Sequence, residues 1–179
     1  MHLRLLLPLV VCLGLSSCGT VSDLQPSTQG AAIASGKMFS KVLVRDFTHT
    51  VADDDGTTPL AARRFSDHIA SAIREAKPGA QVARSGKAGA DTLVIGGEVT
   101  RYMEGNAALR LFVGMGAGSS YFDATVRFID GGDNKELGTL KVDKNSWGLG
   151  GGIAASQTVE SFMTSGAEKT AEEAAKRLR

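Results

Sequence analysis

The alternation of apolar and polar positions predicts a series of β-strands along the chain. Tyr121–Asp130 alternates between apolar and polar residues, so one face of this strand is expected to be solvated. The turn sequence "DGGDN" then leads into a second strand of a hairpin, Glu136–Val142. Buried or half-buried strands are also expected over three other segments, which are 41–47, 81–83 and 90–103. Within the last of these, Gly96 and Gly97 mark a bend, a bulge or a close approach of another backbone.

Two segments carry apolar residues at helical spacing. The first starts at Thr58, a side-chain cap followed by Pro59, and stops before Pro78. Its apolar face consists of Ala62, Phe65, Ile69, Ala72, Ile73 and Ala76. The second spans residues 154–178, and its inner stripe consists of Val159, Phe162, Met163, Gly166, Thr170, Ala174 and Leu178. Small residues on that stripe indicate close packing on a sheet.

The order strand, helix, several strands, helix is typical of an α/β (α+β) fold. We expect a two-layer sandwich in which a mixed β-sheet has its helices packed on one face. The chain has 179 residues, of which 42% are hydrophobic, so it has enough apolar material for one packed domain. This single globular α/β domain is assigned to residues 37–179.

The N-terminal residues 1–17 have the layout of a secretory signal peptide. One cation, Arg4, precedes an apolar stretch that ends in the small residues Ser16 and Ser17. The stretch is shorter than the ~20 residues that a membrane-spanning helix needs. Leu15–Cys18 resembles the cleavage motif of bacterial lipoproteins, which implies that Cys18 is acylated and becomes the new N-terminus. Because Gly19 rather than an aspartate follows Cys18, the resemblance implies the periplasmic face of the outer membrane.

Residues 18–36 are expected to be the lipidated cysteine and a flexible tether. The segment is rich in Gly, Ser, Thr, Ala and Gln and has no sustained periodicity. A flexible segment of this length spans ~20–25 Å on average.

Charge and motifs argue against several classes of function. The chain has 20 basic and 19 acidic side chains, and removal of Arg4 with the signal balances them, so no net field favours nucleic acid. The acidic run Asp53–Gly56 lacks the ligand spacing of a calcium loop, and we expect His49 and His68 to be solvated. No metal, no cofactor and no enzymatic activity are therefore expected, since glycine spacings of nucleotide-binding loops and the Gly-x-Ser-x-Gly motif of hydrolases are missing too.

The most unusual part of the chain after the signal is the glycine-rich stretch between Met103 and Tyr121. Read with period two, its apolar face is Leu109, Leu111, Val113, Met115 and Ala117. We consider two interpretations: a strand extension or loop packed on the domain or on a neighbouring protein, and a β-strand that inserts into and spans the membrane. Trp147 is either a core residue or an interfacial anchor. The possible interaction surface comprises Arg110, Phe112, Gly114, Gly116, Gly118 and Trp147.

The block from Ala90 to Val142 carries a family resemblance. It is similar to the bacterial lipoprotein family called domain of unknown function 4410, in its order of arginine, Gly-x-Gly-x-Gly, aliphatic strand and Asp-turn-Leu. More distantly it resembles the core of the curli secretion channel lipoprotein, at Gly97, Glu98, Val99, Tyr102, Arg110, Gly114, Gly116 and Ala117. In that family two hairpins per subunit build the channel wall, and the corresponding segments are shorter here.

These observations together favour a lipid-anchored envelope protein that acts as a non-enzymatic binding or assembly module. Its partners are expected to be the membrane, through the N-terminal lipid, and an envelope protein or a second copy of the chain. The alternative is a subunit of an oligomeric export or pore complex. A third hypothesis is a hydrolase with an unrecognised site.

Overall fold

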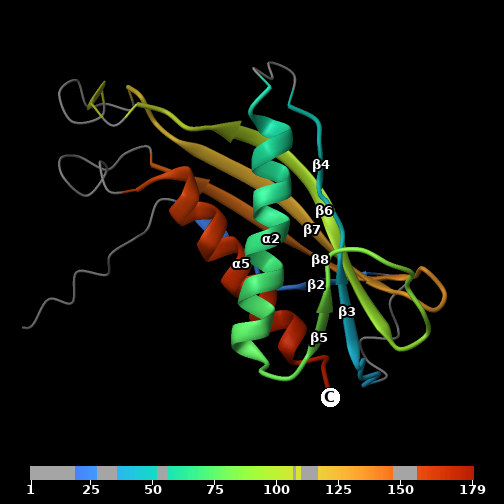
Figure 1. Ribbon diagram of the computed structural model, residues 1–179. Coiled ribbons are helices and arrows are strands. Elements are labelled where there is room, and N and C mark those ends of the chain that lie inside the picture. Colours follow the sequence, from blue (N-terminus) through green and yellow to red (C-terminus); the bar gives the residue numbers. More distant parts are fainter. Residues whose placement is uncertain (1–18, 28–35, 52–55, 107, 110–116, 147–156) are drawn as a thin grey trace, which may run out of the picture.

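The computed structural model describes residues 19–27, 36–51, 56–106, 108–109, 117–146 and 157–179 (Figure 1). Its helices are α2 (Thr58–Ala76) and α5 (Val159–Ala175). Its strands are β1 (Gly19–Val21), β2 (Gln25–Pro26), β3 (Lys41–Val44), β4 (Thr48–His49), β5 (Gln81–Ala83), β6 (Thr92–Met103), β7 (Tyr121–Asp130) and β8 (Glu136–Asn145).

The eight strands form one mixed sheet in the order β1-β8-β7-β6-β3-β5. β6, β7 and β8 are antiparallel neighbours, whereas β3 runs parallel to both β5 and β6. Two further short strands lie off this path: β2 pairs with β8, and β4 pairs with β6 beyond the stretch that pairs with β3. Both helices cover the same face of the sheet and pack against each other (Figure 1). The predicted two-layer α+β fold is therefore confirmed.

One hydrophobic core lies between the helices and the sheet. At its centre the ring of Phe65 from α2 packs edge-on against Phe47, 5.1 Å between ring centres, and against Phe122 of β7, 4.9 Å away. α5 approaches the sheet closely at Gly166, where an added Cβ would lie 3.1 Å from Cγ2 of Val142. All seven residues of the stripe predicted for the second helix are buried. Small residues on that stripe thus permit the expected close packing.

The two helix starts differ from the prediction in detail. The N-cap of α2 is Thr57, whose side chain makes no capping hydrogen bond, and Thr58 is already helical and buried. The prediction of a Thr58 cap is therefore wrong. α5 begins at Val159, because Thr158 and Ser161 form a capping box in which each side chain accepts from the backbone N–H of the other, both at 3.2 Å.

Gly97 is where β7 and a neighbouring phenyl ring approach the backbone of β6. A Cβ at Gly97 would lie 2.8 Å from Cε1 of Phe47 and 3.0 Å from the carbonyl carbon of Thr125. At Gly96 a Cβ would meet only Cβ of Arg45, at an ordinary 3.6 Å. Among the three roles considered for these glycines, Gly97 has that of close approach. The irregularity in the β6–β7 register lies further on, between Val99 and Arg101.

The segment expected to be a tether joins the sheet over part of its length. β1 and β2 both pair antiparallel with β8 and so extend the sheet at that edge. Two apolar side chains of this segment, Val21 and Leu24, pack against the hydrophobic core. The prediction of a flexible tether from 18 to 36 is thus corrected for Gly19–Pro26, because this edge of the sheet offers both hydrogen-bonding groups and apolar surface.

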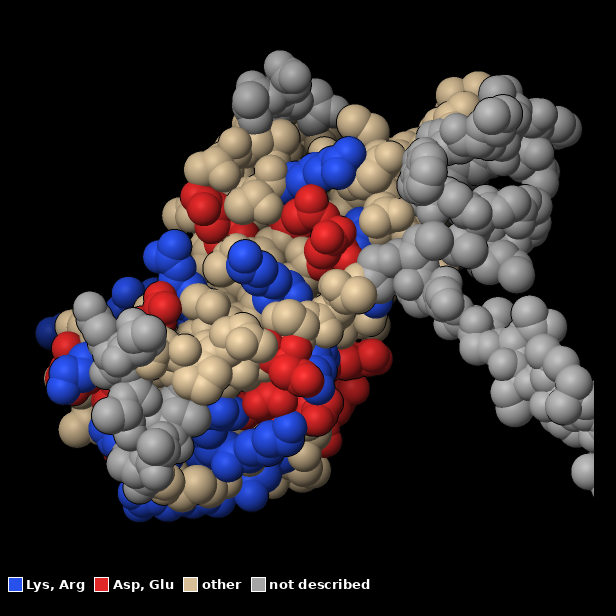
Figure 2. Space-filling view, turned by 180° about the vertical axis from the view of Figure 1, so that it is seen from behind, with Lys and Arg blue, Asp and Glu red and all other residues tan. Residues whose placement is uncertain are grey.

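The face of the sheet that the helices leave uncovered carries charges of both signs (Figure 2). Pairing and alternation place Glu98 and Arg101 of β6, Asp123 and Arg127 of β7, and Lys141 and Asp143 of β8 on it. This face is the wet face predicted for β7. In the described part of the chain, neither helix combines the length and the apolar composition required to span a membrane.

Candidate functional site

The ends of four strands meet at one end of the sheet. The last residue of β6, Met103, pairs with the first residue of β7, Tyr121, which in turn pairs with Asn145, the last residue of β8. One residue back along β8, Lys144 pairs with Gly19, the first residue of β1. We call this region the Met103 end; its described residues are 19–21, 103–106, 108–109, 117–121 and 145–146.

Backbone and serine hydrogen bonds close the base of the loop that joins β6 to β7. The N–H of Asn106 donates to the carbonyl oxygen of Gly118 at 2.8 Å. The hydroxyl of Ser120 donates to the carbonyl oxygen of Glu104. Ser120 also exchanges hydrogen bonds with Ser146, accepting from its N–H at 3.1 Å and donating to its hydroxyl oxygen at 2.8 Å. These hydrogen bonds hold the base of the loop against Ser146, the residue that follows β8.

Two glycines allow the two sides of this loop to come together. Gly105 and Gly118 have φ of +70° and +71°, in the left-handed region that favours glycine. A Cβ at Gly105 would lie 2.6 Å from the carbonyl oxygen of Ser119, and one at Gly118 would lie 2.8 Å from Cβ of Leu109. Gly118, predicted as part of an interaction surface, thus has a structural role in closing the loop. Sequence reasoning missed Gly105, although it stands in the turn-like pair Gly105-Asn106.

The Met103 end exposes apolar side chains beside paired charges. Met103 and Leu109 are 52% and 46% exposed. The guanidinium of Arg101 lies 3.6 Å from the centre of the Tyr121 ring. Arg101 pairs across the sheet with Asp123 of β7, which in turn pairs with Asp143 of β8. Burial, and then the charge of Asp143, raise the pKa of Asp123, while the nearby Arg101 acts in the opposite direction.

A groove of about 270 Å³ lies beside this end, between the start of α5 and the last residues of β6. Its lining side chains already interact with one another or with their neighbours. Glu160 lies 3.5 Å from Nη1 of Arg64 and 2.7 Å from Nε2 of His68, and the hydroxyl of Tyr102 donates to Glu104 at 2.7 Å. His68, predicted to be solvated, is half-buried beside Glu160. His49 is likewise half-buried, in β4.

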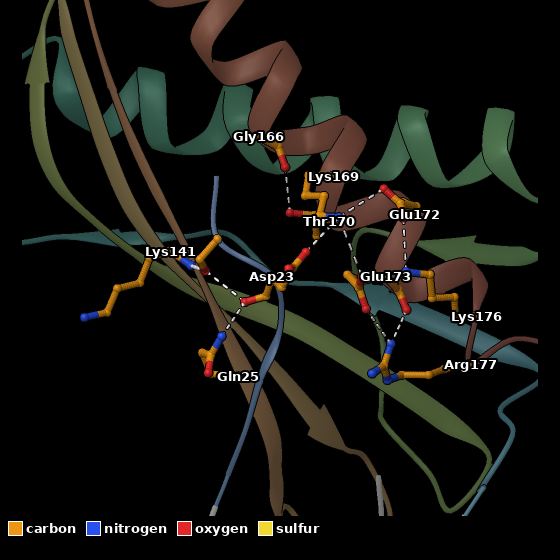
Figure 3. A network of polar contacts seen from close by, with 11 residues as sticks. Asp23, Gln25, Lys141, Gly166, Lys169, Thr170, Glu172, Glu173, Lys176 and Arg177 are labelled. Atoms are coloured by element: carbon orange, nitrogen blue, oxygen red, sulfur yellow. Dashed lines mark hydrogen bonds and ion pairs between the residues drawn. The ribbon is translucent and has the colours of Figure 1, made fainter. Parts of the chain in front are cut away.

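Polar contacts fasten the chain after β1 to α5 and β8 (Figure 3). Nζ of Lys169 lies 3.2 Å from Asp23 and 3.3 Å from Glu172. Hydrogen bonds to Asp23 and then to Glu172 raise the pKa of Lys169. Ser22 exchanges two hydrogen bonds with the backbone of Lys141, each 2.9 Å long. We call Val21–Leu24 with these contacts the N-terminal clamp.

Several predicted site residues lie outside the described part of the chain. They are Cys18, Arg110, Phe112, Gly114, Gly116 and Trp147. The described residues next to them in sequence, Gly19, Leu109, Ala117 and Ser146, all belong to the Met103 end. The acidic run Asp53–Gly56 is described only at Gly56. No group of three or more potential metal ligands occurs in the described ranges.

The region that builds the sheet matches a known family. The family model described as "Domain of unknown function (DUF4410)" matches residues 24–150, well over half of the chain. The chain belongs to the DUF4410 family. The match covers β2 to β8, and β1 and the residues Leu15–Cys18 precede it.

Solved structures share the fold of this DUF4410 protein. A PelC dodecamer from Paraburkholderia phytofirmans matches with a TM-score of 0.54 and 15% identity, over 90% of this chain and 99% of that one. A point variant of the same dodecamer matches with a TM-score of 0.58 and 16% identity, over 90% of this chain and 98% of that one. No curated protein is similar enough to the DUF4410 chain to count as a match.

Proposed function

We propose that this DUF4410 protein is a lipoprotein, anchored through acylated Cys18 to the periplasmic face of the outer membrane, whose domain acts by binding or assembly without catalysis. One observation carries the proposal. β1 begins at Gly19, directly after Cys18, at the same end of the sheet as Leu109, Ala117 and Ser146, the described residues next to the predicted interaction surface. An anchor that begins beside the residues flanking this surface suits a protein that works against a membrane or an assembled partner.

Self-association is the form of assembly with the most support. The similar PelC structures are described as dodecamers, and they share the fold of almost the whole chain. The uncovered sheet face carries both signs of charge, which permits complementary contacts between copies (Figure 2). A subunit of an oligomeric export complex is the second candidate; the dodecameric state of the similar structures supports the ring that it requires.

The first experiment tests the anchor. Cys18→Ser should abolish incorporation of labelled palmitate and release the protein from the membrane fraction. Cys12→Ser is the matched control, because Cys12 lies in the segment removed with the signal and should leave both labelling and fractionation unchanged. Membrane attachment and labelling of the Cys18→Ser variant would refute the anchor.

The second experiment separates the two forms of assembly. The acylated protein is extracted in mild detergent, and its mass is measured by light scattering. A small oligomer supports a binding module that self-associates, whereas a large closed ring supports a subunit of an export complex. A strict monomer at all concentrations would contradict self-association.

A further inference from the structure

We infer that the Met103 end of the sheet faces the lipid leaflet that holds the acyl chains of Cys18, and that Met103 and Leu109 contact this leaflet. The inference rests on the proposed acylation of Cys18. It adds an orientation, which acylation alone does not define, because a domain on a long flexible tether can present any side to the membrane.

The first argument is the short reach between the anchor and the sheet. Cys18 immediately precedes Gly19, which is already paired with Lys144 in the sheet. Consecutive Cα atoms are only ~3.8 Å apart. A freely moving tether over the residues up to Gly36 would have a typical span of ~20–25 Å. The anchor is therefore joined directly to a residue of the Met103 end, with no tether between them.

The second argument is that the N-terminal clamp keeps β1 on the sheet (Figure 3). Ser22 exchanges two hydrogen bonds with Lys141, and Asp23 pairs with Lys169 of α5. Val21 and Leu24 add apolar contacts with the core. Detaching the strand would break these hydrogen bonds and expose apolar surface together, so the anchor and the domain move as one body.

The third argument is the position of the exposed apolar side chains along the sheet. The Met103–Tyr121–Asn145 row lies one residue beyond the row that contains Gly19. The Asp130 end of β7 lies nine residues from Tyr121, which at the rise of a strand is about 30 Å. Met103 and Leu109 therefore lie at the same end of the sheet as Gly19, the residue that follows the anchor, whereas the β7–β8 turn lies at the other end.

The fourth argument is the chemistry of this end. Met103 and Leu109 both expose about half of their apolar side chains. The charged groups around them have both signs, Arg101 and Lys144 against Glu104 and Asp143, so they do not select an anionic surface. Apolar contact added to the acyl chains is enough for attachment to zwitterionic lipid.

The chain permits a sharp test with single cysteines. The acylated mature protein has no free thiol if Cys18 is modified and Cys12 is removed. Met103→Cys and Leu109→Cys each receive an environment-sensitive fluorophore, and Met38→Cys is the matched control. Met38 is a methionine that is 36% exposed, and its neighbour Lys37 pairs with Asp130 at the remote end of the sheet.

The labelled proteins are reconstituted in phosphatidylcholine vesicles that contain lipids with a nitroxide on the headgroup. The fluorophores at 103 and 109 should lose most of their fluorescence and shift to the blue, while the one at 38 should stay at its lipid-free level. Equal and weak quenching at all three positions would overturn the orientation, as would stronger quenching at 38.

A linker variant tests whether the clamp sets the orientation. A flexible segment of about ten Gly and Ser residues, ending in Gly, is inserted after Gly19; it spans roughly 18 Å. The residue after Cys18 is then unchanged, and the last glycine can replace Gly19 in β1. Quenching at 103 should fall toward the level at 38, and unchanged quenching would overturn the inference.

Labelled palmitate keeps the two proposals apart. Weak quenching in a preparation that carries palmitate overturns the orientation alone. A preparation without palmitate overturns the proposed anchor, and the orientation with it.

Discussion

The contrast between Gly96 and Gly97 yields the sharpest prediction about stability. We consider the two substitutions Gly96→Ala and Gly97→Ala, which add the same methyl group to neighbouring positions of β6. At Gly97 the methyl carbon would lie 2.8 Å from Cε1 of Phe47 and 3.0 Å from the carbonyl carbon of Thr125. The carbonyl oxygen of Thr125 would be nearer still, far inside the normal contact distance, so β6 and β7 must separate by more than about 1 Å.

The cost can be estimated from three contributions. Overpacking a filled site costs about 1–3 kcal/mol. The separation also weakens the ladder where Gly97 pairs with Val126 and Glu98 with Thr125, at about 1 kcal/mol for each lost hydrogen bond. Gly97 has a φ of +158°, which alanine rarely adopts, and this backbone strain costs about 1–3 kcal/mol more. The lower entropy of the unfolded alanine chain returns only about 0.4–1 kcal/mol, so we expect a net loss of about 3–6 kcal/mol in the free energy of unfolding.

Gly96→Ala should have the opposite sign. Its methyl group would lie 3.6 Å from Cβ of Arg45, an ordinary contact, so the entropic gain of up to about 1 kcal/mol remains. Both variants are measured by urea unfolding in a Cys18→Ser background, with circular dichroism as the signal. Equal effects at the two positions, or a stable Gly97→Ala protein, would refute the close approach of β7 at Gly97.

Three further predictions concern the core, the sheet face and the clamp. Phe65→Ala should lower the free energy of unfolding by about 3–5 kcal/mol, because the Phe65 ring contacts both Phe47 and Phe122. Leu60→Ala, at an exposed position, should change it by less than about 0.5 kcal/mol. Similar losses for the two variants in urea unfolding would contradict the assigned core. Asp123→Asn should stabilise the protein by up to about 1 kcal/mol at neutral pH, because the raised pKa of Asp123 means that folding favours the protonated carboxyl. The gain should vanish below about pH 4, where the carboxyl is protonated in both the folded and the unfolded state. A gain that is independent of pH would exclude this cause. Asp23→Asn should speed amide hydrogen exchange over Ser22–Ser27, because it removes the ion pair with Lys169. Glu168→Gln, a substitution at an exposed residue next to Lys169, should leave that exchange unchanged. Unchanged exchange in Asp23→Asn would show that the ion pair does not hold the N-terminal clamp.

Local patterns in the sequence predicted most of the fold because burial imposes them. The stripe predicted from Val159 to Leu178 is buried at every position, and its residues up to Ala174 lie on α5, since a helix packed on a sheet must present its apolar residues on one side. The helix itself ends at Ala175, before Leu178, which pairs instead with Phe39. β7 and β8 followed from strict alternation and a glycine-rich turn. The short strand β1 escaped notice because Val21 is its one apolar side chain, which is too little for a periodic signal.

The arrangement of the candidate site depended on contacts between distant parts of the chain. Nothing local at Gly19 indicates that it pairs with Lys144, and nothing at Asp23 indicates that it meets Lys169. The order of strands in the sheet brings the end of β6 beside the start of β7 and both beside β1 and β8, and alternation does not encode that order. Sequence reasoning therefore identified candidate segments without predicting that their flanking residues share one end.

The central claim is that a lipid is attached to the residue from which the sheet begins. Mass spectrometry of the N-terminal peptide of the membrane-purified protein tests it most directly. The account predicts a peptide that starts at Cys18 and carries the added mass of fatty acyl chains. A peptide that retains residues before Cys18, or that starts there with an unmodified thiol, would contradict the account.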